Sequence, residues 1–260
     1  MEVVIVADAT EIGCVVADAV QALLAGHPGA VLGLASGSAP LPVYDELVRR
    51  CADGRISFSL ATAFLLDEYV GLPAGHPESY RSVIDRTFSG RVDFAAGAVR
   101  GPDGTAADVV AACRAYEDAI AAAGGVDLQI LGLGRDGHIA FNEPGSSLGS
   151  RTRLKTLTSQ TVSDNGRFFG PDDVVPRHVL TQGVGTILDA RHLVLIAAGA
   201  GKAEPLARVV EGPVTAMVPG SALQLHPHVT VVADAAAAEE LTLADYYRAA
   251  WAGKPPWQGL

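Results

Sequence analysis

Residues 31–51 read VLGLASGSAPLPVYDELVRRC and contain the first complete building block of the fold. The apolar run 31–35 predicts a strand, the chain breaks at the SGS of 36–38, and Pro40 suits the first turn of a helix reaching about Cys51. A strand of continuous apolar residues is typical of a sheet buried on both faces. The stretch therefore predicts a strand–loop–helix unit of an α/β protein.

The same alternation continues outward in both directions. Further strands are predicted at 3–7, 58–66, 128–133, 192–198 and 229–233, and helices at 10–25 (capped by Thr10), at 106–123, from Lys202 onward and over the alanine run 235–238. Strands that alternate with helices predict parallel βαβ units. No repeat or linker interrupts the pattern. We therefore expect one domain over 1–260, an open, mostly parallel sheet with helices on both faces, of the Rossmann-like α/β class.

Composition excludes several classes of function. The 260 residues include 19 basic and 29 acidic ones, and the net charge of −10 predicts no nucleic-acid partner and no binding to an anionic membrane. The three cysteines form no CxxC pair, which argues against a disulfide framework or a zinc knuckle. The first residues, MEVVIVADATEIG, resemble neither a signal peptide nor a membrane span. We expect a cytoplasmic protein.

Ligands of such sheets bind beyond the carboxyl ends of the strands, so the residues that follow the strands matter most. Ser36, Gly37 and Ser38 favour an anion through hydroxyl and free N–H groups, although an ordinary serine-capped turn has the same pattern. Asp67 and Glu68 follow an apolar strand. They are either a general base in a cleft or a solvated strand end.

Residues 132–145, GLGRDGHIAFNEPG, follow another predicted strand. The glycine spacing matches a dinucleotide-binding loop, but NEPG interrupts where the helix should begin, so we reject NAD binding. Asp136, His138 and Glu143 remain, an imidazole between carboxylates that suits proton transfer. Metal binding is the competing chemistry, and the single histidine argues against it.

Residues 199–202, GAGK, resemble a phosphate loop but lack the Walker pattern, because Ile196 and Ala203 stand where Gly and Ser/Thr are required. This excludes ATP hydrolysis. It leaves a sugar phosphate, which Lys202 can hold as a point charge.

Several segments taken together resemble the glucosamine-6-phosphate deaminase family. They are, in the family's order, LGLASGSAPLPVYDELV, LLDEYVGLPAGHPESY, GLGRDGHIAFNEPGSSLGSRTRLKTLT, DNGRFF and SALQLHPHVTVV. DEYVGL together with DGHIAFNEP is the most specific part. The wider superfamily includes 6-phosphogluconolactonase and shares its α/β fold with ribose-5-phosphate isomerase. The region from Leu241 onward matches weakly, so the resemblance assigns no role to Tyr246 or Tyr247.

The resemblance implies conversion of glucosamine 6-phosphate and water to fructose 6-phosphate and ammonia, with no metal or organic cofactor. Asp67 matches the enolisation base, His138 the group that opens the sugar ring, and Asp136 and Glu143 the residues that assist it. The residues matching the phosphate-holding set are Ser36, Gly37, Ser38, Arg167 and Lys202. Ala39 replaces a threonine of the usual TGSTP loop, a loss of one hydroxyl worth about 1 kcal/mol of binding.

The resemblance also implies regulation. Ser146, Arg153 and Lys155 match residues that bind an activating N-acetylglucosamine 6-phosphate between subunits of allosteric members, and we expect a homo-oligomer, with a hexamer favoured. The alternative is a basic surface strand. Other functions remain open: a 6-phosphogluconolactonase-like hydrolase, a deaminase of another hexosamine 6-phosphate, and a non-catalytic sugar-phosphate sensor. The complete Asp136–His138–Glu143 set favours the enzyme.

Overall fold

The computed structural model describes residues 1–170 and 173–260, and its centre is a seven-stranded parallel sheet. The strands are ordered β1-β10-β9-β6-β2-β3-β5, and every neighbouring pair runs parallel. Their bounds are β1 Glu2–Val6, β2 Val31–Leu34, β3 Thr62–Leu65, β5 Val99–Arg100, β6 Leu128–Gly132, β9 His192–Ala197 and β10 Val229–Asp234. The open, mostly parallel sheet predicted from the apolar runs is confirmed.

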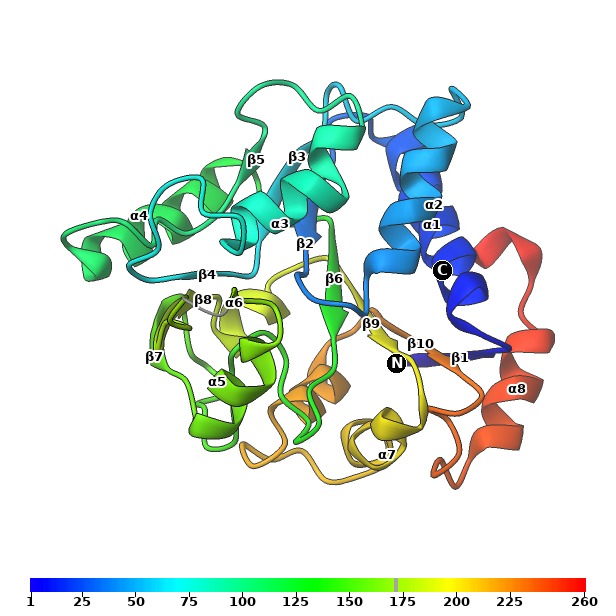
Figure 1. Cartoon of the computed structure of the whole chain (residues 1–260). Coiled ribbons are helices and arrows are strands. Elements are labelled where there is room, and N and C mark those ends of the chain that lie inside the picture. Colours follow the sequence, from blue (N-terminus) through cyan, green and yellow to red (C-terminus); the bar gives the residue numbers. More distant parts are fainter. Residues whose placement is uncertain (171–172) are drawn as a thin grey trace.

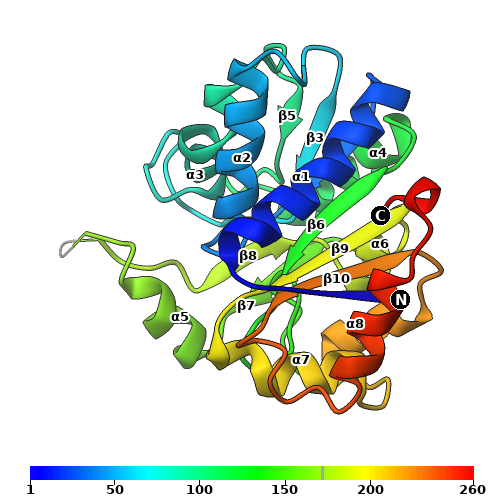
Figure 2. The same cartoon turned by 90° about the vertical axis from the view of Figure 1, so that its right-hand side faces the viewer.

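Helices cover both faces of this sheet (Figures 1 and 2), as predicted. The α-helices of the described residues are α1 Ala9–Gly26, α2 Leu41–Ala52, α3 Tyr80–Thr87, α4 Val109–Ala122, α5 Ser159–Gly166, α6 Val184–Leu188, α7 Ala203–Val210 and α8 Ala244–Ala252. Figure 2 places α1 and α2 on one side of the sheet and α7 on the other. The chain moves one way along the sheet from β1 to β5 and the other way from β5 to β10. Because crossovers between parallel strands are as a rule right-handed, this reversal places helices on opposite faces.

The four strand ends selected from the sequence belong to β9, β6, β2 and β3, which are consecutive neighbours in the sheet. Because these strands are parallel, their carboxyl ends lie at one edge. The chain reverses its direction of travel along the sheet within this group, and ligands of open α/β sheets bind at such a point. The topology therefore brings together four loops that are far apart in the sequence.

A second, smaller sheet was not predicted. It is antiparallel, with the order β4-β8-β7, and consists of β4 Asp67–Tyr69, β8 His178–Thr181 and β7 Arg153–Thr156. The expectation of a single sheet was incomplete for this reason. Figure 1 shows these strands with α5 on the side of the molecule away from the two termini. The predicted strand 58–66 is shorter, Thr62–Leu65, and the chain turns into β4 directly after Leu66.

The structure corrects several of the predicted helices. The cap of α1 is Asp8, whose side chain accepts the Glu11 N–H at 2.9 Å, and Thr10 lies inside the helix. A short 3-10 turn, Ala200–Lys202, precedes α7. Residues 235–240 form turns instead of a helix, because Asp234 accepts the Ala237 N–H at 2.7 Å and the buried Ala237 packs on the core.

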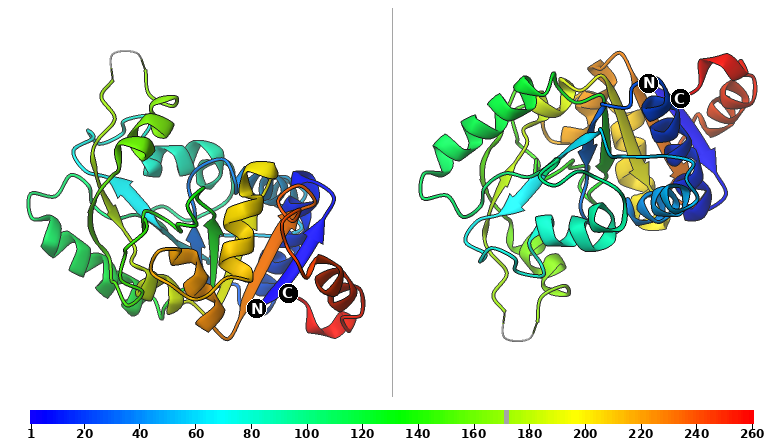
Figure 3. Two further views of the ribbon diagram at one scale, coloured as in Figure 1. Left: turned by 90° about the horizontal axis from the view of Figure 1, so that it is seen from below. Right: turned by 90° about the horizontal axis from the view of Figure 1, so that it is seen from above.

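The core fills both sides of the large sheet and includes one face of α1, where Ile12, Val16, Val20 and Leu24 are buried. In the described part of the chain, α1 is the one helix long and apolar enough to cross a membrane by length and composition, and burial of this face is typical of a core helix. The two termini lie close together beside β1 (Figure 3), where Lys254 pairs with Glu2 at 2.5 Å.

Candidate functional site

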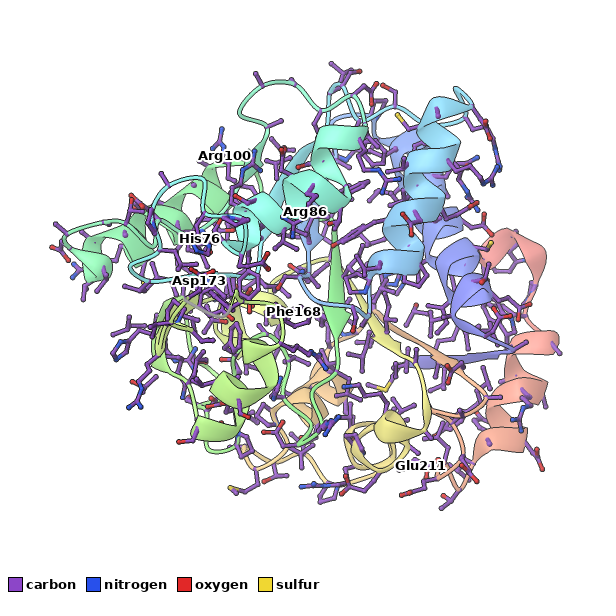
Figure 4. All side chains as sticks on the ribbon, in the orientation of Figure 1. His76, Arg86, Arg100, Phe168, Asp173 and Glu211 are labelled. Atoms are coloured by element: carbon purple, nitrogen blue, oxygen red, sulfur yellow. The ribbon has the colours of Figure 1, made fainter. Side chains whose placement is uncertain are left out.

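A cavity of about 440 Å³ opens at the carboxyl ends of the central strands. It is lined by residues that follow β2, β3, β6 and β9, and by residues of α3 and α5 and of the segment after α5. In Figure 4, Arg86 lies on the α3 side of this cavity and Phe168 on the α5 side. Its volume suits a small metabolite. Of the predicted catalytic and phosphate-binding residues, it is lined by Ser36, Gly37, Ser38, Asp67, His138, Arg167 and Lys202.

Asp67 is the first residue of β4, at the point where the chain leaves the parallel sheet. Its side chain is buried, 4% exposed, and accepts a hydrogen bond from the Ser36 hydroxyl at 3.3 Å. Burial raises the pKa of Asp67 to about 7, the neighbouring charge of Glu68 adds to the rise, and the Ser36 hydrogen bond opposes it. Asp67 therefore has the proton affinity of a base that works near neutral pH.

The loop after β2 lies beside this carboxylate. Gly37 adopts a φ of +92°, a conformation that L side chains rarely adopt and that lets the loop turn between the hydroxyls of Ser36 and Ser38. Ala39 also lines the cavity and packs close to Gly132, where a Cβ would lie 3.5 Å from its own. The turn therefore lines the cavity with the two hydroxyl-bearing residues Ser36 and Ser38, and Ala39 adds no hydroxyl.

His138 and Asp136 form a close pair in the loop after β6. The imidazole Nδ1 lies 2.6 Å from Asp136 Oδ1, and the same oxygen accepts the His138 backbone N–H at 3.1 Å. Burial alone would raise the pKa of the Asp136 carboxyl. The hydrogen bonds and the charge interaction with His138 outweigh the effect of burial, so the pKa of Asp136 is lowered. The ring packs against Gly134, where an added Cβ would come within 2.3 Å of it. Gly134 thus makes room for the imidazole.

Glu143 lies behind the cavity and is not among its lining residues. Its buried carboxylate accepts hydrogen bonds from the hydroxyls of Thr161 at 2.6 Å and Thr158 at 3.1 Å. Thr161 itself lines the cavity, so the Glu143 carboxylate is connected to it through α5. Between His138 and Glu143, Ala140 is the one non-glycine residue of the described chain with a positive φ, 49°, and it too lines the cavity. Such strain is typical of functional loops.

Another part of the cavity is lined by three cationic side chains, those of Arg135, Arg167 and Lys202. Lys202 donates a hydrogen bond from Nζ to the Leu133 carbonyl oxygen at 2.6 Å, and burial and the nearby charges of Arg135 and Arg167 lower its pKa. This concentration of positive charge favours a dianion such as a phosphate monoester. The Gly199 N–H is not available, since both carboxylate oxygens of Asp234 accept it at 2.8 and 3.0 Å. The GAGK segment therefore contributes the positive charge of Lys202 to the cavity more than backbone N–H groups that could bind an anion.

Sequence reasoning missed one wall of the cavity, which is aromatic. Tyr69 of β4 and Tyr80 of α3 stack with ring centroids 4.7 Å apart, and Asn165 of α5 donates to the Tyr69 hydroxyl at 2.7 Å. Phe141 and Phe169 complete this wall. Arg86 and Arg135 were also missed. The one signal for Arg135 was its place inside GLGRDGHIAFNEPG, whereas Arg86 lies beyond the end of the quoted segment that closes at Tyr80 and had no such signal.

The candidate regulatory residues lie apart from the cavity. Arg153 and Lys155 are half-buried on β7, an edge strand of the small sheet. Burial lowers the pKa of Arg153, whose guanidinium donates to the Arg151 carbonyl oxygen at 3.4 Å. Ser146 is buried, and its hydroxyl has no hydrogen-bond partner among the described residues.

A larger cavity, about 840 Å³, lies at the amino ends of the strands, between α1 and the C-terminal residues 251–260. None of the residues predicted from the sequence lines it. His192 and His228 stack there with ring centroids 3.7 Å apart, and burial and the nearby charges lower the pKa of His192 to about 4. No group of three or more His, Cys, Asp or Glu side chains suited to a metal ion occurs in residues 1–170 and 173–260.

A Rossmann-like sheet with a buried carboxylate, an oriented imidazole and a cationic pocket at its carboxyl edge defines the class: an α/β protein suited to acid–base chemistry on a small anion. The sequence profile described as glucosamine-6-phosphate isomerases/6-phosphogluconolactonase matches residues 7–232. The chain belongs to this family, which confirms the resemblance found in its motifs.

Individual relatives place the chain within the family. It is 66% identical to the glucosamine-6-phosphate deaminase of Beutenbergia cavernae and 65% identical to that of Mycolicibacterium smegmatis, over the whole of each chain. Among solved structures, a monomeric glucosamine-6-phosphate deaminase is 39% identical with a TM-score of 0.89, over 92% of this chain and all of that one. The 6-phosphogluconolactonase of Thermotoga maritima shares the fold, with 20% identity and a TM-score of 0.71 over 90% of this chain and 98% of that one.

Proposed function

We propose that this protein, with residues 1–260 acting as one domain, converts glucosamine 6-phosphate and water to fructose 6-phosphate and ammonia in amino-sugar catabolism. The observation that carries the proposal is the full-length identity to glucosamine-6-phosphate deaminases, at 66%. The cavity supplies groups that this reaction needs, since Asp67 and His138 both line it. The reaction consists of proton transfers and the hydrolysis of a carbon–nitrogen bond. Acid–base groups can catalyse both, and we propose that no cofactor takes part.

His138 opens the sugar ring in this proposal. Ring opening removes a proton from the C1 hydroxyl and delivers one to the ring oxygen, and an imidazole can do both. Asp136, 2.6 Å from Nδ1, holds the ring in orientation. Glu143 assists from behind the cavity, through the hydrogen bonds that it accepts from the hydroxyls of Thr161 and Thr158.

Asp67 then transfers the proton from C2 to C1 of the open sugar. Removing the C2 proton gives an enol, and protonation at C1 leaves an imine at C2. Water adds to the imine carbon, and ammonia then leaves as the C2 carbonyl of fructose 6-phosphate forms. A carboxylate with a pKa of about 7 is a stronger base than an ordinary aspartate, and burial keeps it so.

The other end of the substrate is the phosphate. Ser36, Gly37 and Ser38 approach it with hydroxyl and N–H groups, while Arg167 and Lys202 supply positive charge. Binding energy from the phosphate then orients C1 and C2 against the two proton-transfer groups, so this end of the molecule contributes to the rate at the other.

Product analysis tests the activity directly. The purified protein is incubated separately with glucosamine 6-phosphate, galactosamine 6-phosphate and 6-phosphogluconolactone, and ammonia, ketose phosphate and acid release are measured. We expect equal amounts of fructose 6-phosphate and ammonia from the first substrate. A protein that hydrolyses only the lactone, at a rate unchanged by Asp67→Asn, would instead be a lactonase, which needs no enolisation base. Preference for galactosamine 6-phosphate would assign the other epimer.

Regulation is a separate proposal. We propose that Ser146, Arg153 and Lys155 bind N-acetylglucosamine 6-phosphate between subunits of a cytoplasmic homo-oligomer, a hexamer. The half-buried Arg153 supports an anion site here, because a desolvated guanidinium is stabilised by a bound negative charge. The 39%-identical structure is of a monomeric enzyme, so the oligomeric state must be measured. A monomeric mass at micromolar concentration, with hyperbolic kinetics unaffected by the acetylated sugar phosphate, would overturn this proposal.

A further inference from the structure

Glu68, the residue after Asp67, has a buried carboxylate that faces the first turn of a helix. Its Oε1 accepts the backbone N–H groups of Tyr69 at 2.8 Å and Tyr80 at 2.9 Å, and its Oε2 accepts that of Arg81 at 2.9 Å. The side chain is 8% exposed. Tyr80 and Arg81 are the first two residues of α3, whose N–H groups have no partner within the helix. Glu68 therefore fixes the start of α3 to β4.

This connection matters because α3 forms part of the cavity. Tyr80, Val83, Arg86 and Thr87 of α3 all line it. Ser79, the residue that caps α3 in the usual way, accepts the Ser82 N–H at 3.2 Å but carries no charge. The helix thus has two caps. One is an ordinary serine from its own segment, and the other is a carboxylate from the strand that carries Asp67.

We propose that Glu68 is a positioning residue for the reaction: its carboxylate fixes the α3 wall of the cavity to β4 and holds a negative charge next to Asp67. The inference rests on the proposed role of Asp67 as the base. Three backbone N–H donors stabilise the Glu68 carboxylate and oppose the effect of burial, which on balance still raises its pKa. No side chain needs to pair with it.

The charge acts on Asp67 together with the other groups around that carboxylate. Asp67 interacts electrostatically with Glu68 and Tyr69 of β4, with Tyr80 of α3 and with Tyr116 of α4. His138, Arg86, Arg135, Arg167 and Lys202 line the same cavity. Among these interacting groups of the described residues, Glu68 is the one carboxylate, and its charge raises the pKa of Asp67.

Two variants separate the two effects of Glu68. Glu68→Gln removes the charge and at least one of the three hydrogen bonds, whereas Ser79→Ala weakens the start of α3 and leaves the charge in place. The pH dependence of kcat/KM for glucosamine 6-phosphate is measured for both and for the wild type. In Glu68→Gln we expect a kcat loss of about 10-fold and an acid limb at least about 0.5 pH unit lower, since Asp67 ionises more readily. Ser79→Ala should lose stability but keep the wild-type limb.

An acid limb in Glu68→Gln that coincides with the wild type would overturn the proposal, however large the loss of activity, because Glu68 would then be a structural cap alone. Where Glu68→Gln does not fold, Glu68→Asp replaces it, with the charge retained on a shorter side chain. It should keep the acid limb and raise KM, and a downward-shifted limb would contradict the proposal.

A titration of Asp67 distinguishes failure of this inference from failure of the proposed function. The Asp67 carboxyl carbon is followed by NMR in the wild type and in Glu68→Gln, with Asp67→Asn used for assignment. A lower Asp67 pKa in the variant supports the role of Glu68 even if the wild type releases no ammonia. Equal values in an active enzyme would reject Glu68 and leave the deaminase proposal intact.

Discussion

The Nδ1 of His138 lies 2.6 Å from Oδ1 of Asp136, and both residues belong to a loop that closes on itself through a hydrogen bond from the Gly134 N–H to the His138 carbonyl oxygen, at 2.8 Å. In the proposed mechanism Asp136 occupies the Nδ1 side of the ring, which leaves Nε2 for the substrate. His138→Gln should therefore lower kcat for glucosamine 6-phosphate by about 100-fold, because the ring is opened without its proton carrier. Steady-state kinetics on the pyranose substrate check this, and a loss below threefold would contradict it.

Gly134 offers a steric test of the same pair. An added Cβ would lie 2.3 Å from the imidazole, so Gly134→Ala should displace the ring and lower kcat about 10-fold or more. Gly149→Ala is the matched control, because nothing lies within 4 Å of its Cβ. If the two variants had equal kcat, the ring orientation would not limit the reaction.

Lys202 tests the phosphate end. Lys202→Met should raise KM for glucosamine 6-phosphate about 10- to 100-fold, since a charge-assisted contact to phosphate is lost from a partly buried position. Arg248→Met removes a cation from α8, outside the cavity, and should leave KM unchanged. An unchanged KM in Lys202→Met would move the phosphate elsewhere in the cavity.

Asp67 should destabilise the folded protein at alkaline pH. The pKa of this carboxyl is about 7 in the folded state and about 4 in the unfolded one, so between these values the folded protein holds a proton that the unfolded chain has lost. The free energy of unfolding therefore falls as the pH rises through this window. Asp67→Asn should be more stable than the wild type at pH 8, by ~2–4 kcal/mol, and similar to it at pH 4. Denaturant titrations at the two pH values measure this, and a less stable variant at pH 8 would contradict the raised pKa.

His192 should have the opposite effect at acid pH. Burial and neighbouring charges lower its folded-state pKa to about 4, below the unfolded value, so stability is full above about 6.5 and is lost as the pH falls toward 4. His192→Gln should flatten the dependence of Tm on pH in that window. An unchanged slope would show that other groups cause the acid sensitivity.

The sequence could predict what depends on local pattern. Continuous apolar runs indicated the buried strands, and glycine and polar residues after β2, β3, β6 and β9 indicated the edge where the cavity lies. The small sheet could not be predicted, because Asp67–Tyr69 is a three-residue strand whose partner, His178–Thr181, is far along the chain.

The same reason explains the missed aromatic wall. Tyr69, Tyr80 and Asn165 come from three separate segments and meet only through the tertiary fold. The alanine run after β10 was mispredicted because a local side-chain hydrogen bond and burial override helix propensity there. The link between Glu68 and α3 likewise requires coordinates, since a carboxylate after Asp67 has the same appearance in a solvated strand end.

The central claim is that Asp67 moves a proton between C2 and C1 of an amino-sugar phosphate. The most direct test is the reaction of glucosamine 6-phosphate in deuterated water, with kcat and deuterium at C1 of fructose 6-phosphate measured for wild type and Asp67→Asn. We predict product from the wild type with solvent deuterium in part of its C1 positions, and a kcat at least ~100-fold lower in Asp67→Asn with KM within a few-fold. An Asp67→Asn variant that forms fructose 6-phosphate within 10-fold of the wild-type rate would contradict the account.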